Sequence, residues 1–110
     1  MAGARLFVCY PHPTDPAAFE RAYAQEHVPM ATPILAGVGA ERAVLTRLAD
    51  TPHGKPHFYR IEEIHFPSLE KLSEALGSPD FQRAVSDANR LSTGGPVVAM
   101  IGAEVQTVTF

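Results

Sequence analysis

The sequence predicts an α+β protein with a ferredoxin-like split βαβ plan, in which a four-stranded antiparallel sheet carries helices on one face. The hydrophobic period changes along the chain in the order strand, helix, strand, strand, helix pair, strand. The chain has 110 residues, of which 45% are hydrophobic and 19% charged, enough for one core of two layers. We therefore expect a single domain over residues 1–110.

The expected strands are apolar segments bounded by turn-forming residues. They cover residues 6–10, 40–48, 57–66 and 97–101, and the last continues in an extension to residue 110. Helices on one side leave the other face of the sheet without cover, and the last strand is an almost continuous apolar stretch. We therefore expect a second subunit to cover that face, which makes the protein a homodimer.

The first helix is expected to begin at Asp15, a good N-cap residue, with Pro16 at the first helical position. Four side chains recur on its inward face at spacings of four and three: Phe19, Tyr23, His27 and Met30. Two prolines and two glycines are expected to end this helix: Pro29, Pro33, Gly37 and Gly39.

The helix pair between the third and fourth strands has two start signals. Ser68 is the expected cap of a helix that carries Leu69, Leu72 and Leu76 and ends at Gly77. Ser78 and Pro79 begin the next helix, whose apolar positions are Phe81, Ala84, Val85, Ala88 and Leu91.

His27 is the first candidate catalytic residue. It occupies the expected last turn of the first helix, just before Pro29, where the helix dipole favours a protonated imidazole. With Tyr23 one turn back on the inward face, His27 can act as a general acid or base beside an apolar cavity. The alternative is that His27 only hydrogen-bonds the last carbonyls of its helix.

The third strand supplies a second candidate pair. Because side chains alternate along a strand, His57, Tyr59, Ile61, Glu63 and His65 share one face, whereas Phe58, Arg60, Glu62, Ile64 and Phe66 share the other. Glu63 and His65 project in parallel about 7 Å apart, which makes them a candidate catalytic acid–base pair. The alternative is that they form cross-strand ion pairs, with their face turned to the dimer cavity or to solvent.

Tyr10 ends the first strand, where its phenol can donate a hydrogen bond to a substrate carbonyl. It can equally be a core aromatic whose hydroxyl reaches water. A further set of side chains is expected to line the substrate pocket: Tyr23, Tyr59, Phe19, Met30 and His12. His12 lies in a proline-rich turn near the expected pocket mouth, and its alternative is simple exposure to solvent.

Several classes of partner are not expected. The net charge of −3 has no basic block, which argues against nucleic acid. The single cysteine, Cys9, excludes an intramolecular disulfide and a CxxC zinc site, and fits a reducing cytoplasm. The N-terminus lacks a signal-peptide core, and no segment approaches the ~20 apolar residues of a membrane span. We expect an unprocessed cytoplasmic protein.

No cofactor or metal is expected either. His27, Glu63 and His65 together have the two-histidine, one-carboxylate composition of non-haem iron sites. No local HxxxH or HxD pair places two of these ligands in advance, however, so separately hydrogen-bonded histidines are the preferred interpretation.

Four short motifs occur in the order and spacing of a known family: Tyr10-Pro11-His12, Glu26-His27-Val28-Pro29, Glu63-Ile64-His65-Phe66 and Ser78-Pro79. On these motifs the chain resembles the EthD family of dimeric α+β barrel proteins over nearly its whole length. The resemblance implies a ferredoxin-like dimer with a small-molecule pocket between sheet and helices. Relatives in the same superfamily isomerise lactones, oxidise or dehydrate aromatic polyketides without a cofactor, or bind haem.

The preferred interpretation is a cofactor-independent enzyme that uses His27, helped by tyrosines, for proton transfer on a small apolar, lactone or phenolic compound. Isomerisation and dehydration are the expected reaction types. The alternative is a non-catalytic binding or accessory protein of a catabolic or stress pathway, whose polar groups only orient a ligand. A third possibility is haem binding through His27.

Overall fold

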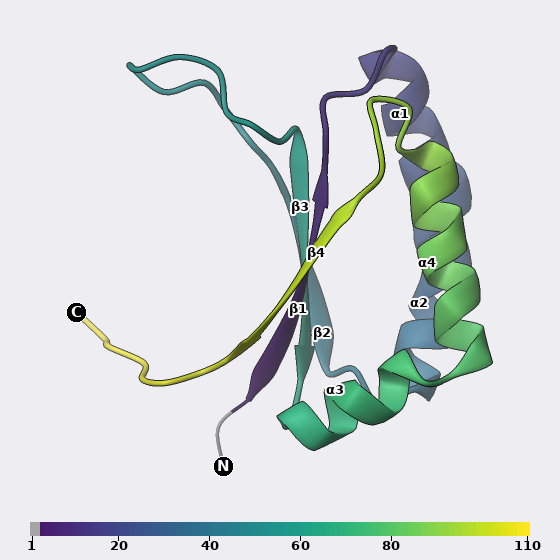
Figure 1. Cartoon of the computed structure of the whole chain (residues 1–110), viewed down its shortest axis with the longest axis vertical. Helices are drawn as coiled ribbons and strands as arrows, with labels where there is room; N and C mark the ends of the chain where they lie inside the picture. The colour runs from purple at the N-terminus through teal and green to yellow at the C-terminus, as the bar shows by residue number, and fades with distance from the viewer. Residues whose placement is uncertain (1–2) are drawn as a thin grey trace.

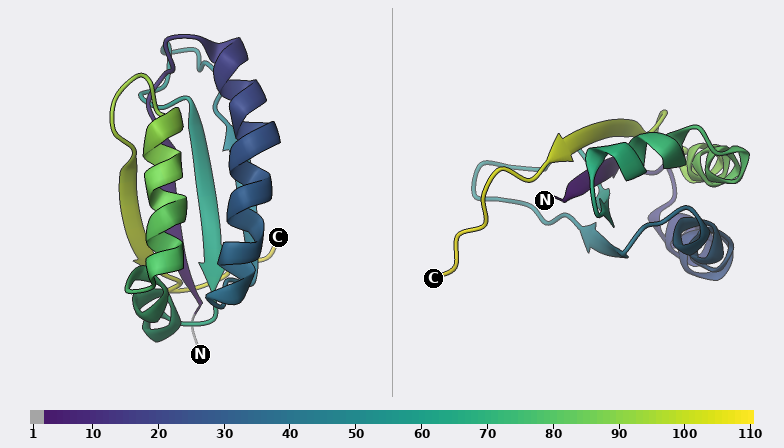
Figure 2. Two further views of the ribbon diagram at one scale, coloured as in Figure 1. Left: turned by 90° about the vertical axis from the view of Figure 1, so that its right-hand side faces the viewer. Right: turned by 90° about the horizontal axis from the view of Figure 1, so that it is seen from below.

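The computed structural model describes residues 3–110 and contains one antiparallel sheet with the strand order β2-β3-β1-β4 (Figure 1). The strands are β1 (Ala4–Tyr10), β2 (Arg42–Arg47), β3 (Arg60–Phe66) and β4 (Val98–Ala103). All helices lie on one side of this sheet, as both views of Figure 2 show. The predicted ferredoxin-like plan is confirmed.

One long helical segment connects β1 and β2. It consists of α1 (Pro16–Ala22), a π-helical turn η1 (Tyr23–His27) and α2 (Val28–Gly37), which follow one another without a break. Asp15 caps the start as predicted, because its side chain accepts a hydrogen bond of 3.1 Å from the backbone N–H of Ala18.

The prediction that Pro29 and Pro33 end this helix is wrong, because the helix continues to Gly37. In the π turn the N–H of Val28 bonds to the carbonyl of Tyr23, five residues back. Proline lacks an N–H and its ring clashes with the carbonyl four residues earlier in a regular α-helix. A widened turn immediately before Pro29 relieves this clash, which is how π-bulges accommodate such residues.

Two helices connect β3 and β4. α3 (Leu69–Leu76) begins after Ser68, whose side chain accepts a hydrogen bond from the N–H of Lys71 at 3.2 Å, as predicted. α4 (Pro79–Leu91) follows Gly77 and Ser78 and runs alongside α2, as Figure 2 shows.

The last strand is shorter than predicted. β4 ends at Ala103, which pairs with Ala4, the first residue of β1. One further backbone hydrogen bond follows, from the N–H of Glu104 to the carbonyl of Gly3 at 2.8 Å. Residues 104–110 instead lead away from the sheet, with Val105, Val108 and Phe110 exposed (Figure 1). β3 likewise begins at Arg60, opposite Tyr10, and not at residue 57.

The two faces of the sheet differ in character. Leu6, Ile64 and Phe66 point to the helices and pack with Leu72 and Phe81 in the main core. The strand register places a second set of residues on the opposite face, here called the outer face: Arg5, Phe7, Cys9, Arg42, Val44, Ile61, Glu63, His65, Val98 and Met100. No helix among residues 3–110 is long and apolar enough to cross a membrane.

Two leucines of α3 allow a matched test of this core. Leu72 is 1% exposed, whereas Leu69 in the same helix is 49% exposed. We expect Leu72→Ala to lower the free energy of unfolding by about 2–5 kcal/mol, and Leu69→Ala to change it by roughly 0.5 kcal/mol or less. Urea unfolding followed by circular dichroism measures both, and equal losses would contradict the described packing of α3.

Candidate functional site

A cavity of about 200 Å³ lies between the sheet and the helices. Its walls are almost wholly apolar and come from β1, α2, β3, α3, α4 and the start of β4: Leu6, Val8, Ala31, Leu35, Ile64, Leu76, Phe81, Ala84, Val85, Ala88, Val97 and Ala99. Three polar side chains also line it: His27, Glu62 and Gln82. A small site of this kind suits an apolar ligand that is oriented by few polar groups.

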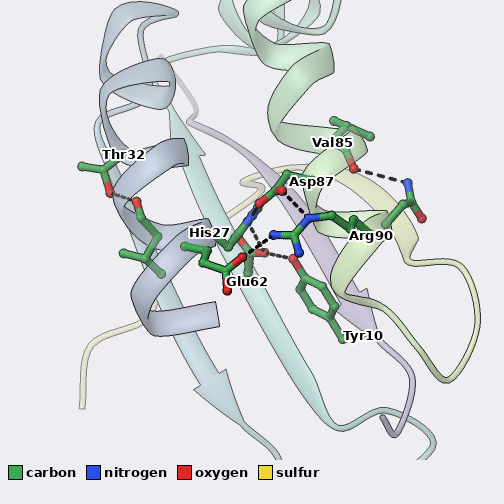
Figure 3. A network of polar contacts seen from close by, with 10 residues as sticks. Tyr10, His27, Thr32, Glu62, Val85, Asp87 and Arg90 are labelled. Atoms are coloured by element: carbon green, nitrogen blue, oxygen red, sulfur yellow. Dashed lines mark hydrogen bonds and ion pairs between the residues drawn. The ribbon is translucent and has the colours of Figure 1, made fainter. Parts of the chain in front are cut away.

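Two of these polar groups belong to one buried network (Figure 3). The hydroxyl of Tyr10 donates a hydrogen bond of 2.6 Å to Oε1 of Glu62. His27 lies beside the same carboxylate, with Nε2 3.7 Å from Oε1, and its Nδ1 lies 2.9 Å from Oδ2 of Asp87. The side chains of His27 and Glu62 are only 5% and 7% exposed, so this pair is almost closed off from bulk water.

The network continues from Asp87 to the molecular surface. Oδ1 of Asp87 accepts a hydrogen bond of 2.8 Å from Arg90 Nε, and Arg90 also pairs with Glu26 at 3.2 Å. Asp87 and Arg90 line a surface groove of about 400 Å³ together with Met30, Pro79, Gln82, Arg83 and Ser86. The His27 imidazole therefore lies in the wall of the apolar cavity, while its partner Asp87 lies in the wall of the surface groove.

The environment of His27 favours its charged form. Burial by itself lowers the pKa of an imidazole, but the neighbouring carboxylates of Glu62 and Asp87, of which Asp87 is hydrogen-bonded to Nδ1, outweigh burial and raise the pKa of His27. Burial raises the pKa of Asp87, but hydrogen bonds from Arg90 and His27 reverse this effect and lower it. The two carboxylates on either side of the imidazole thus favour its charged form.

Tyr10 keeps its proton at neutral pH and acts as a hydrogen-bond donor. Burial, the negative charge of Glu62 and the hydrogen bond to Glu62 raise the pKa of the Tyr10 phenol far above its usual range. Tyr10 therefore holds Glu62 in place by donating to it. Its own hydroxyl is occupied by this bond, so the structure does not present it to a ligand carbonyl.

Phe19 and Tyr23 lie behind the network and not in the cavity wall. Their rings pack against Tyr10, with centroids 5.4 Å and 5.7 Å away, and the Tyr23 ring lies 5.4 Å from that of His27. The guanidinium of Arg60 lies over the Tyr23 ring at 4.3 Å. This aromatic cluster holds the imidazole and the phenol in their orientations.

The structure does not bring Glu63 and His65 together with His27. Both lie on the outer face, because β3 alternates and its helix-facing positions are Glu62, Ile64 and Phe66. Nδ1 of His65 lies 3.4 Å from the Nε atoms of both Arg5 and Arg42. Burial and the charges of these two arginines lower the pKa of His65, so this imidazole is neutral at pH 7.

Three further predicted pocket residues lie elsewhere. Met30 lines the surface groove, while Ala31 takes the position in the cavity wall. His12 is half-buried, and its Nε2 lies 2.7 Å from the carbonyl oxygen of Pro56. Tyr59 packs against His12 at 6.0 Å and donates a hydrogen bond of 2.8 Å to Glu20.

The sequence reasoning missed two members of the network, Glu62 and Asp87. Glu62 had a detectable signal, because it is an acidic residue on the strand face that also carries Ile64 and Phe66. Asp87 had none, since it meets His27 only through the packing of α4 against the first helical segment.

The structure separates the three residues that together had the composition of an iron site. His27 faces the helix-side cavity, whereas Glu63 and His65 lie across the sheet on the outer face. Over residues 3–110 no group of three or more histidine, cysteine, aspartate or glutamate side chains is arranged to hold a metal ion.

The fold and the site define a ferredoxin-like α+β protein with a helix-side cavity and a buried carboxylate–imidazole pair. Residues 11–94 match the EthD domain. An uncharacterized 11.0 kDa protein in the thcB-thcC intergenic region of Rhodococcus erythropolis is 30% identical over 104 residues, which are 94% of this chain and 96% of that protein. The chain belongs to the EthD family, as its motifs predicted.

Solved structures similar to this chain include two that bear on its family and its fold. An ethyl tert-butyl ether D family protein of Bacillus halodurans has a TM-score of 0.82 and 28% identity, with 96% of this chain and 100% of that chain covered. The cofactor-independent oxygenase SnoaB of Streptomyces nogalater has a TM-score of 0.62 and 17% identity, with 98% and 95% covered. At this identity, the likeness to SnoaB shows the fold alone.

The charge state of His27 predicts how stability depends on pH. Because its pKa is higher in the folded state than the unfolded value of 6.5, its stabilising contribution is complete below pH 6.5 and is lost as the pH rises through the folded pKa. The groups that face this imidazole are Tyr10, Tyr23, Glu62 and Asp87. We expect the difference in melting temperature between the wild type and His27→Gln to be largest below pH 6.5 and to shrink above it.

Differential scanning fluorimetry in a series of buffers measures this difference. His57→Gln, at an exposed histidine, serves as the matched control and should follow the wild type at every pH. A difference that grows as the pH rises would show that His27 is buried in its neutral form.

Proposed function

We propose that the chain binds a small, largely apolar molecule in its helix-side cavity and transfers a proton at the His27–Glu62 pair. The observation that carries this proposal is the position of the two side chains in the wall of an otherwise apolar cavity, 3.7 Å apart at Nε2 and Oε1. Buried charged groups are expensive, and their concentration in one wall of a cavity is typical of a functional site.

The two groups suit opposite halves of a proton transfer. The Glu62 carboxylate can accept a proton from a ligand carbon or oxygen, while the charged His27 can donate one at another atom of the same ligand. The proton count balances in an isomerisation: one proton leaves the ligand to Glu62, and one returns from His27. A proton passed from Glu62 back to His27 restores both groups. Asp87 acts through His27 as a positioning residue.

We expect a second copy of the chain to bind to the outer face of the sheet. The outer face is partly apolar, and Val98 and Met100 on it are 42% and 49% exposed. A homodimer would cover these side chains. Catalysis without a cofactor is supported by SnoaB, a cofactor-independent oxygenase with the same fold.

A non-catalytic binding protein is the second candidate function. The hydrogen bond from the Tyr10 hydroxyl to Glu62 favours this function, because it leaves that hydroxyl unable to donate to a substrate. The polar side chains of the network then serve only to orient a ligand. If the protein is an enzyme, loss of the His27 charge removes turnover, whereas a binding protein has no turnover to lose.

We expect thermal shift assays to find compounds that stabilise the wild type, and His27→Gln to abolish turnover of such a compound while binding persists. At one hundred times its dissociation constant a ligand adds about 2.7 kcal/mol, a shift of several degrees for a domain of this size. Turnover followed by nuclear magnetic resonance, which resolves an isomer of unchanged mass from its parent compound, decides between enzyme and accessory protein. His57→Gln is the control and should retain wild-type turnover, whereas unaltered turnover in His27→Gln would contradict the assigned role.

A further inference from the structure

We infer that the ligand of the cavity is a neutral compound with a single hydroxyl group at its polar end, and that this hydroxyl donates to Glu62 and accepts from His27. The inference rests on the proposed function of the cavity and specifies the class of ligand. It predicts that hydroxy compounds bind in preference to lactones, ethers and other molecules that only accept hydrogen bonds.

The hydrogen bonds of Glu62 leave one acceptor free. Its Oε1 accepts the bond from Tyr10, whereas Oε2 takes part in no hydrogen bond among residues 3–110. An ionised carboxylate that is 7% exposed normally has several donors around it. Among residues 3–110, a neighbouring donor without a partner is the buried hydroxyl of Tyr23, whose pKa is raised by burial and by Glu62, but it makes no hydrogen bond to this carboxylate. Since Glu62 lines the cavity and Tyr23 does not, a donor carried by the ligand can complete the coordination of Glu62 from the cavity side.

The hydrogen bonds of His27 leave one donor free. Its Nδ1 is committed to Asp87, while Nε2 lies 3.7 Å from Glu62 Oε1, beyond hydrogen-bond length. The polar end of the cavity therefore offers one acceptor and one N–H donor side by side. A hydroxyl group satisfies both, because its hydrogen can point to Glu62 while its oxygen accepts from His27. A carbonyl or ether oxygen can satisfy only His27.

The charges of the network favour a neutral ligand. The two carboxylates that contact the buried imidazole, Glu62 and Asp87, are matched by the charged forms of His27 and Arg90. The third carboxylate of the network, Glu26, is 59% exposed and is therefore screened by water. A charged ligand would have to leave water without a counter-ion of its own in the cavity, and such a transfer is costly.

The size and walls of the cavity favour one ring. An apolar cavity of about 150 Å³ lined by Leu, Ile and Phe is large enough to bind benzene. The present cavity of about 200 Å³, with Ile64, Leu76 and Phe81 in its walls, has room for a ring with one or two small substituents. 4-Methylphenol is therefore a suitable probe.

The test is a matched series of ring compounds, with dissociation constants measured by isothermal titration calorimetry at pH 7. 4-Methylphenol carries the hydroxyl, 4-methylanisole can only accept a hydrogen bond, and 4-methylbenzoate is charged. We expect the wild type to bind 4-methylphenol at least roughly tenfold more tightly than either of the others, because each leaves the Glu62 carboxylate buried without its donor.

Glu62→Gln and Glu63→Gln form a matched pair of variants, since the two residues are neighbours on opposite faces of β3. Glu62→Gln replaces the free acceptor with a donor while keeping its size. We expect this variant to reduce the preference for 4-methylphenol over 4-methylanisole to roughly threefold or less. Glu63→Gln should keep the preference of the wild type.

The possible failures are distinguishable. Equal or tighter binding of 4-methylanisole to the wild type would overturn the inference and leave the proposed binding function standing. If none of the three compounds binds, both the inferred hydroxyl recognition and the proposed binding of a single-ring ligand in the cavity are overturned. If Glu62→Gln does not give the circular dichroism spectrum of a folded protein, the wild-type series alone decides.

Discussion

The burial of the Glu62 carboxylate is the constraint around which the site is organised. A charged carboxylate under two helices is expensive unless donors and a positive charge surround it. Tyr10 from β1 supplies a donor, and His27 from the first helical segment supplies the charge. Asp87 from α4 then balances His27 from the other side. Each of these side chains comes from a different element, so the site exists only when sheet and helices are packed together.

The π turn is the local structure that brings the first helical segment into contact with this buried network. It spans Tyr23–His27 and so contains both side chains that face the network from the first helical segment. The widened turn also allows the helix to continue through Pro29, so that Ala31 and Leu35 of α2 reach the cavity wall. Pro29, which the sequence suggests as a stop signal, is compatible with the helix because the turn before it is π-helical.

The fold could be predicted from the sequence because it depends on local patterns. The periods of the apolar residues identify the strands and helices, and Asp15 and Ser68 mark helix starts through their own side chains. The continuation through Pro29 could not be predicted, since a π turn has no local signature here. The sequence correctly divides the residues of β3 between the two faces of the strand. Which of these faces meets the helices depends on tertiary packing. This is why Glu63 was preferred to Glu62, and why Asp87 was not foreseen.

The position of His27 between two compartments has a consequence for any proton transfer. Its Nε2 side faces the apolar cavity with Glu62, whereas its Nδ1 side meets Asp87, which lines a groove on the surface. Asp87 is 17% exposed, so this carboxylate contacts solvent while the imidazole does not. The charge of His27 can therefore respond to the pH of the surrounding water without opening the cavity. A ligand bound as proposed would lie beside a histidine that stays connected to the surface through Asp87.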